Sequence, residues 1–93
     1  MFKKLNPLLH SQLRLAIISL LSQVDSAAFT YLKEQTHATA GNLSIQIKKL
    51  EAAGYLQVKK TFKNNYPLTT CSITKKGARA FEEYIDALKD YIG

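Results

Sequence analysis

The sequence predicts a mainly α-helical domain of the α+β class, with about four helices and two to three short strands, including one β-hairpin. Three observations support this prediction. Apolar residues recur with a helical period up to Gly54, they alternate with polar residues just after it, and a helical period returns near the carboxyl end. The chain of 93 residues has the size of one small domain, so we expect residues 1–93 to fold as a unit.

The clearest element is the expected helix 39–53. Thr39 precedes it, and a threonine hydroxyl can accept a hydrogen bond from a free amide of the first turn. Gly54 follows it, and glycine adopts the left-handed conformation after a helix at little cost. Both ends of this helix are therefore marked in the sequence.

This helix has two different faces. Successive residues advance about 100° around a helix axis, so Leu43, Ile47 and Leu50 share one narrow apolar face. The other positions carry amides, two cations and one isolated aliphatic side chain. They are Gly41, Asn42, Ser44, Ile45, Gln46, Lys48 and Lys49, and together with Thr39 they are the candidate binding residues of this helix. Amides and cations are the groups that read adenine and guanine edges in a major groove, although a solvated surface helix has a similar pattern.

A shorter helix precedes this one. Phe29 and Leu32 have helical spacing over residues 29–35, and residues 36–38 leave room only for a turn. Two helices joined by a tight turn, the second with a polar face, form a helix-turn-helix.

The first and last helices are expected at about 6–24 and 75–92. Asn6 and Pro7 favour a helix start, and Thr74 can cap the last helix. Each helix carries more apolar surface than one small core needs, which indicates a second subunit. The expected dimer-interface residues are Leu8, Leu15, Ile18, Phe81, Tyr84, Leu88 and Tyr91.

Between the helices, a β-hairpin is expected. Strand-like alternation runs from Leu56 to Phe62, a turn cluster occupies residues 63–67, and a second β-rich segment follows at 69–74. The hairpin tip is basic and polar. Its candidate binding residues are Lys59, Lys60, Lys63, Asn64 and Asn65.

The charge distribution suits a polyanionic partner. The net charge is +6, yet four of the seven acidic residues lie close to the carboxyl end. They are Glu82, Glu83, Asp86 and Asp90. We therefore expect a basic body that binds nucleic acid, and a terminal segment that faces away from phosphate. A lipid surface fits less well, because the cations are spread over several elements.

The sequence contains little that supports catalysis. His10, His37 and Cys71 are the main nucleophile or base candidates besides carboxylates and hydroxyls, and no metal-binding spacing or phosphate-binding glycine loop is present. We expect no enzyme activity, no metal and no cofactor. Cys71 alternates with Ile73, which favours a buried structural thiol, with a redox sensor as the alternative. One cysteine and no signal-peptide pattern predict a cytoplasmic protein.

The order helix, helix-turn-helix, hairpin, helix is that of a winged-helix domain. The segments Thr39-x-Gly41-Asn42-Leu43-Ser44 and Leu50-Glu51-x-x-Gly54-Tyr55 resemble those of small homodimeric winged-helix transcriptional regulators related to the MarR and ArsR groups. Weaker matches are Phe29-x-x-Leu32, Pro67-x-Thr69 and Ile73-Thr74-x-x-Gly77, so the resemblance covers nearly the whole chain.

The resemblance implies a role for each element. The helix 39–53 would enter a major groove, the hairpin 59–69 would be a wing on the DNA backbone, and the first and last helices would form the dimer. The chain also departs from the family pattern. Ile45 stands where a polar residue or arginine is common, and Asn65, Tyr66 and Leu68 occupy wing positions that often hold arginine.

From residues and resemblance together, we expect a sequence-specific, double-stranded DNA-binding transcriptional regulator that acts as a homodimer. The alternative is a winged-helix module that binds protein or RNA without recognising an operator. The sequence identifies neither an operator nor a small-molecule effector.

Overall fold

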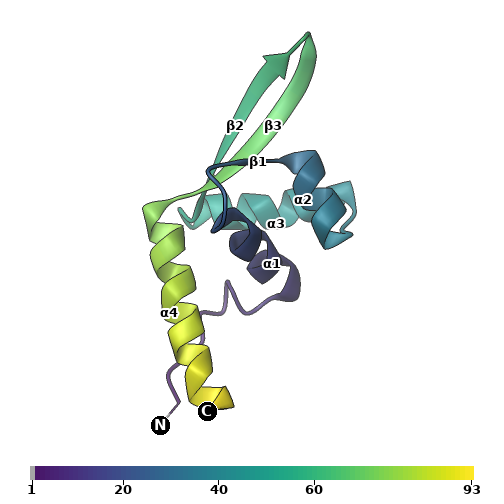
Figure 1. Ribbon diagram of the computed structural model, residues 1–93. Helices are drawn as coiled ribbons and strands as arrows, with labels where there is room; N and C mark the ends of the chain where they lie inside the picture. The colour runs from purple at the N-terminus through teal and green to yellow at the C-terminus, as the bar shows by residue number, and fades with distance from the viewer. Residues whose placement is uncertain (1) are drawn as a thin grey trace.

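The computed structural model describes residues 2–93 and contains four helices and a small antiparallel sheet, most of which extends beyond the helices (Figure 1). The elements are α1 (Gln12–Leu21), β1 (Ala27–Ala28), α2 (Phe29–Thr36), α3 (Ala40–Ala52), β2 (Leu56–Lys63), β3 (Tyr66–Ile73) and α4 (Lys75–Ile92). The strand order is β1-β3-β2, with both pairings antiparallel. The predicted winged helix-turn-helix is confirmed. The molecule is elongated, with extents of 54 × 25 × 21 Å.

The first helix is shorter than predicted. The Asn6–Pro7 signal starts a single turn instead of a helix, because the Asn6 side chain accepts hydrogen bonds from the amides of Leu8 and Leu9 and the turn then ends. Ser11 is extended, and its hydroxyl accepts from the amide of Arg14, so α1 begins only at Gln12. It ends at Leu21 instead of at residue 24.

The helix-turn-helix is confirmed with boundaries close to the predicted ones. Thr39 caps α3 by accepting a hydrogen bond from the amide of Asn42 at 3.2 Å. After α3, Gly54 adopts a φ of 81°, the left-handed conformation expected there. The amide of Tyr55 donates to the carbonyl of Leu50, which closes the end of the helix.

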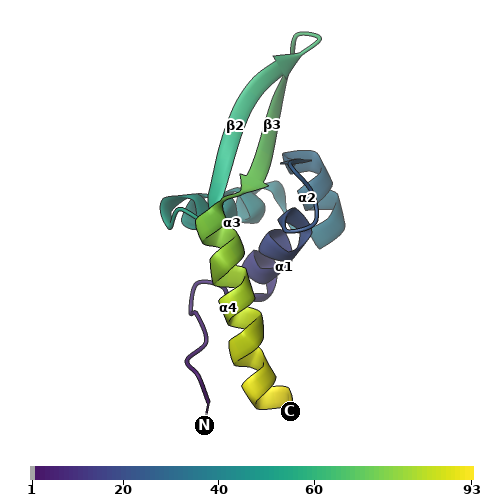
Figure 2. The same cartoon turned by 60° about the vertical axis from the view of Figure 1, so that its left-hand side comes forward.

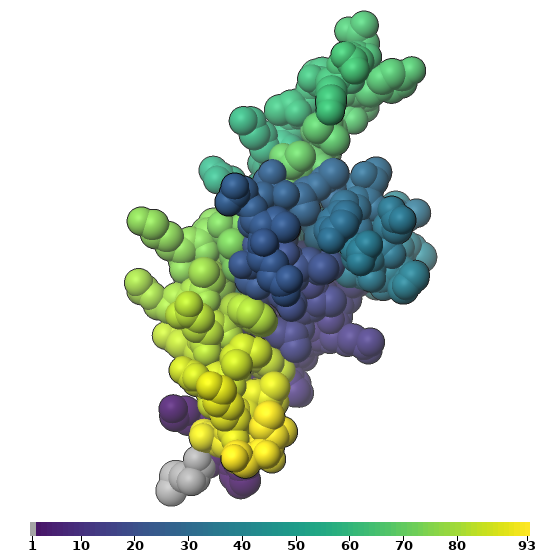
Figure 3. Space-filling view, in the orientation of Figure 1, coloured from purple at the N-terminus to yellow at the C-terminus, as the bar shows by residue number. Residues whose placement is uncertain are grey.

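The hairpin is longer than predicted, and its turn is tighter. The predicted five-residue turn is a two-residue turn at Asn64 and Asn65, whose φ angles of 52° and 67° fit a type I′ turn. Tyr66 and Pro67 are therefore strand residues. They were assigned to the turn because proline is common in loops. Phe62, predicted to share a face with Leu56, is 78% exposed because the hairpin extends past the core. Figures 2 and 3 show the hairpin projecting from the rest of the molecule.

Helix α4 carries two apolar stripes, although the sequence analysis expected its apolar residues at one dimer interface. The first stripe is buried against the rest of the chain, and we call it the inner stripe. It consists of Gly77, Ala80, Tyr84 and Ala87. A second stripe, Phe81, Ile85 and Leu88, is only half-buried and packs against the edge of the core. We call this second stripe the outer stripe.

Two expected interface residues lie in the core of their own chain. Ile18 is fully buried, and Tyr84 is 4% exposed and bonds the Nδ1 of His10 through its hydroxyl at 3.0 Å. Ile18 of α1 and Tyr84 of α4 belong to the same buried cluster, so packing between elements of one chain uses both side chains.

Candidate nucleic-acid interface

The outward face of α3 is accessible to a partner. Gly41, Asn42, Lys48 and Lys49 are exposed, and Ile45 is 54% exposed between them. The opposite face supplies Leu43, Ile47 and Leu50 to the core, as the helical period predicted. Local periodicity therefore placed the polar face correctly.

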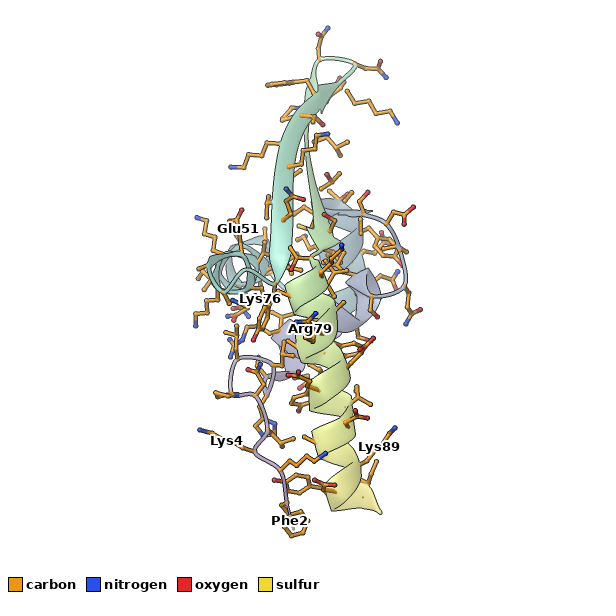
Figure 4. All side chains as sticks on the ribbon, turned by 90° about the vertical axis from the view of Figure 1, so that its left-hand side faces the viewer. Phe2, Lys4, Glu51, Lys76, Arg79 and Lys89 are labelled. Atoms are coloured by element: carbon orange, nitrogen blue, oxygen red, sulfur yellow. The ribbon has the colours of Figure 1, made fainter. Side chains whose placement is uncertain are left out.

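A groove separates α3 from the hairpin. Ser44, Lys48 and Glu51 line it from α3, and Val58, Lys60 and Thr69 line it from the strands. Half-buried Ser44 lies at the edge of the α3 face and lines this groove. Figure 4 shows Glu51 beside the base of the hairpin. The sequence pattern did not point to Glu51 and Thr69, because they come together only once the hairpin packs beside α3.

The hairpin lysines do not form one cluster. Side chains alternate between the two faces of a strand, so Lys60 lines the groove with Val58. Lys59 lies on the opposite face beside Gln57 and Thr61. Lys63 has the same parity as Lys59 and is exposed near the tip. The hairpin therefore presents cations on both sides, with only one of the three toward the α3 groove.

Asn64 and Asn65 have a conformational role that the sequence analysis did not assign. Both adopt positive φ, which asparagine tolerates better than most residues. They are exposed at the tip, so a binding contact is compatible with this role.

A chain of hydrogen bonds joins α1 to the start of α3. The guanidinium of Arg14 donates to Oε1 of Gln46 at 2.5 Å, and Nε2 of Gln46 donates to Oδ1 of Asn42 at 3.0 Å. Arg14 also donates through Nε to the carbonyl of Leu8 at 2.6 Å. Gln46 is thus half-buried and engaged, whereas the sequence analysis treated it as a free reading residue. No local pattern pointed to Arg14, because it lies 32 positions from Gln46 along the chain.

Cys71 is buried, as predicted. It is 1% exposed, and burial together with the charge of Glu51 raises the pKa of its thiol above the ordinary value of 9.0. Within residues 2–93, no three His, Cys, Asp or Glu side chains are grouped to hold a metal ion. In the same part of the chain, no helix has the length and apolarity needed to cross a bilayer.

The fold and the exposed α3 face define a winged-helix domain of the nucleic-acid-binding class. The chain belongs to the family described as the winged helix DNA-binding domain, whose model matches residues 13–92. An uncharacterized protein of Methanocaldococcus jannaschii is 40% identical over 76 residues, which cover 82% of this chain and 83% of that protein.

Solved structures give the same result. A transcriptional regulator homologue from Pyrococcus horikoshii superposes with a TM-score of 0.85 at 28% identity, over 91% of this chain and 84% of that one. The Bacillus subtilis regulator PadR, solved with operator DNA, superposes with a TM-score of 0.72 at 15% identity. That match covers 81% of this chain and 47% of PadR, and it shows a shared fold alone. The resemblance to winged-helix transcriptional regulators is confirmed.

Proposed function

We propose that the chain is a sequence-specific, double-stranded DNA-binding transcriptional regulator that acts as a homodimer. Helix α3 enters the major groove, and the wing, residues 59–69 of the hairpin, lies on the backbone. The observation that carries this proposal is the accessible polar face of α3, with Asn42 in the first turn and Lys48 and Lys49 farther along. The first turn of a recognition helix comes closest to base edges, while later cations neutralise phosphates.

The placement of charge supports this orientation. The hairpin forms one end of an elongated molecule and α3 lies beside its base, and both carry exposed lysines (Figure 1). Glu82, Glu83, Asp86 and Asp90 lie along α4, which runs away from the hairpin (Figure 1). Phosphate attraction is therefore directed at the α3 and hairpin end, and repulsion is kept away from it.

The outer stripe of α4 supports the dimer. Phe81, Ile85 and Leu88 pack against the chain's own core but stay half-buried, so part of each side chain is free for a second subunit. Half-buried Leu8 and Leu15 remain available from the N-terminal part. Tyr91 is 48% exposed and already stacks on Phe2 of its own chain, with ring centroids 4.7 Å apart. Ile18 and Tyr84 leave the proposed interface because they are buried within one chain.

Selection of duplexes from a random pool, followed by fluorescence anisotropy, tests DNA binding. We expect a palindrome with half-sites on the order of 10 base pairs apart. Asn42→Ala should cost roughly 1–3 kcal/mol on the selected site and relax one or two positions. Lys49→Ala should weaken every duplex and reduce the log-affinity versus log-salt slope by about 1.

Lys89→Ala is the matched control. It removes the same charge from α4, where Lys89 pairs with Asp86 at 3.6 Å far from the hairpin (Figure 4). If Asn42→Ala and Lys49→Ala bind duplexes as the wild type and the control do, α3 does not read DNA. The protein–protein or RNA interaction module then becomes the better interpretation.

Light scattering tests the dimer. The wild type should have twice the chain mass of 10.4 kDa at micromolar concentration. Ile85→Asp should yield a folded monomer, because it places a charge in the outer stripe and leaves the inner stripe intact. A wild-type protein that stays monomeric would exclude the palindromic geometry while leaving single-site DNA binding open.

A further inference from the structure

The hydrogen-bond chain from Arg14 through Gln46 to Asn42 has a fixed direction. A guanidinium has only donors, so the Gln46 atom that it contacts must be the acceptor Oε1. The other end of the Gln46 amide is then Nε2, which can only donate. The Asn42 atom that receives this bond must be Oδ1, at 3.0 Å. One cation on α1 thus fixes the orientation of two amides on α3.

This direction decides which atom Asn42 offers to a partner. Its Oδ1 is turned along the helix toward Gln46, and within residues 2–93 its Nδ2 donates to no protein acceptor. The side chain is exposed in the first turn of α3. A free asparagine can turn either its oxygen or its nitrogen outward, but this one presents the amide NH₂ group.

We propose that Arg14 and Gln46 are positioning residues that set Asn42 as a hydrogen-bond donor, so that it selects a keto base. The inference rests on the proposed DNA-binding function and refines it. In the major groove, guanine O6 and thymine O4 accept hydrogen bonds, the adenine N6 and cytosine N4 amino groups donate, and N7 of both purines accepts. Where it reaches the O6 or O4 position, a donor in the first turn of α3 therefore favours guanine or thymine over adenine or cytosine. A contact with N7 alone does not separate guanine from adenine.

The decisive variant is Gln46→Glu. A carboxylate keeps the contact with Arg14 but can only accept, so Asn42 must turn its NH₂ group toward residue 46 and expose Oδ1. Selection from a random pool identifies the base pair that Asn42 contacts, because the preference at that position disappears in Asn42→Ala. At that position the wild type should prefer keto over amino bases by about tenfold, and Gln46→Glu should reverse the preference. Gln12→Glu, an equal charge change at the exposed start of α1, should leave the preference unaltered.

A second pair of variants separates positioning from stability. Arg14→Met and Arg14→Lys both remove the Nε bond to the Leu8 carbonyl, so thermal unfolding should shift to a similar degree in both. Lysine is also a donor without an acceptor and can hold the Gln46 oxygen, so Arg14→Lys should retain the keto preference. Arg14→Met should reduce it to less than about threefold, because both amides can then turn over.

The outcomes separate the two proposals. If the wild type binds duplexes and Gln46→Glu keeps the keto preference, or if the wild type prefers amino bases at this position, the positioning role is overturned and DNA binding stands. If Arg14→Met and Arg14→Lys select identically, Arg14 has only a structural role. A wild type that binds no duplex overturns the proposed function itself and this inference with it.

Discussion

Helices α3 and α4 begin with the same local device in opposite surroundings. Thr39 and Thr74 are both extended N-cap residues, and their side chains accept hydrogen bonds from backbone amides in the first turn at 3.2 Å and 3.0 Å. A glycine follows within three residues of each threonine, Gly41 in α3 and Gly77 in α4. By sequence alone, the two helix starts look equivalent.

Their environments differ completely. A Cβ atom added to Gly77 would lie 2.2 Å from the carbonyl oxygen of Tyr55, whereas one added to Gly41 would meet nothing within 4 Å. Thr74 also donates through its hydroxyl to the carbonyl of Gly54 at 2.6 Å, which ties α4 to the end of α3. One start is thus a packing contact of the fold. The other is an open surface, which is what a binding partner needs.

The largest expected effect comes from Gly77→Ala. The added methyl group would overlap backbone atoms that cannot move without displacing β2 from α4. We expect a loss of about 3 kcal/mol in the free energy of unfolding, at the upper end for overpacking. Urea unfolding followed by circular dichroism measures it. A loss below about 1 kcal/mol would show that the two helix starts are less different than the structure indicates.

The two capping threonines provide the next comparison. Thr74→Ala should cost about 2 kcal/mol, because it removes a cap and leaves the Gly54 carbonyl without its hydroxyl donor. Thr39→Ala removes only a cap at an exposed position and should cost about 1 kcal/mol. The same urea titration serves both variants, and equal losses would contradict the proposed division between a packed and an open helix start.

Gly41→Ala should separate binding from stability. With open space around Gly41, alanine has no steric cost and a better helix propensity, so stability should stay constant or rise by up to about 1 kcal/mol. If α3 approaches DNA at this point, the new methyl group should weaken binding about tenfold. Anisotropy and urea unfolding on the same preparation test both parts. Unchanged DNA affinity would place the contact surface elsewhere on α3.

The smallest effect is expected at Cys71, near the other end of α3. Cys71→Ser should lower stability by about 1 kcal/mol at neutral pH, because it buries a poorly paired hydroxyl. The raised thiol pKa means that the folded protein keeps this proton to higher pH than the unfolded chain. The contribution of the buried, protonated thiol to stability is complete below pH 9.0 and is lost as pH rises through the folded-state pKa. The difference in the free energy of unfolding between wild type and Cys71→Ser should therefore shrink in that range.

Urea unfolding of both proteins at neutral pH and at about pH 10 checks this, since the other titrating groups cancel in the difference. A redox sensor predicts another result. Mild peroxide would then abolish DNA binding by the wild type and spare Cys71→Ser.

Sequence patterns identified most of the fold because the signals involved are local. The Thr39 cap, the left-handed Gly54 and the apolar period of α3 each depend on neighbouring residues, and each was found. The Asn6–Pro7 signal failed because a local cap can end a single turn as well as start a helix. At both ends of α3 and at the start of α4, capping and packing favoured the same element, so those predictions held.

Only part of the candidate site could be predicted, because sequence patterns report local structure and not contacts between distant residues. Sequence by itself determined which face of α3 is polar, because a face follows from a period of 3.6 residues. Only the tertiary structure decided that Arg14 reaches Gln46, that Tyr84 is buried while Ile85 is half-buried, and that Gly77 is packed while Gly41 is free. These contacts join residues that are distant along the chain, and they exist only once packing has fixed the distances between helices. Neither composition nor periodicity contains that information.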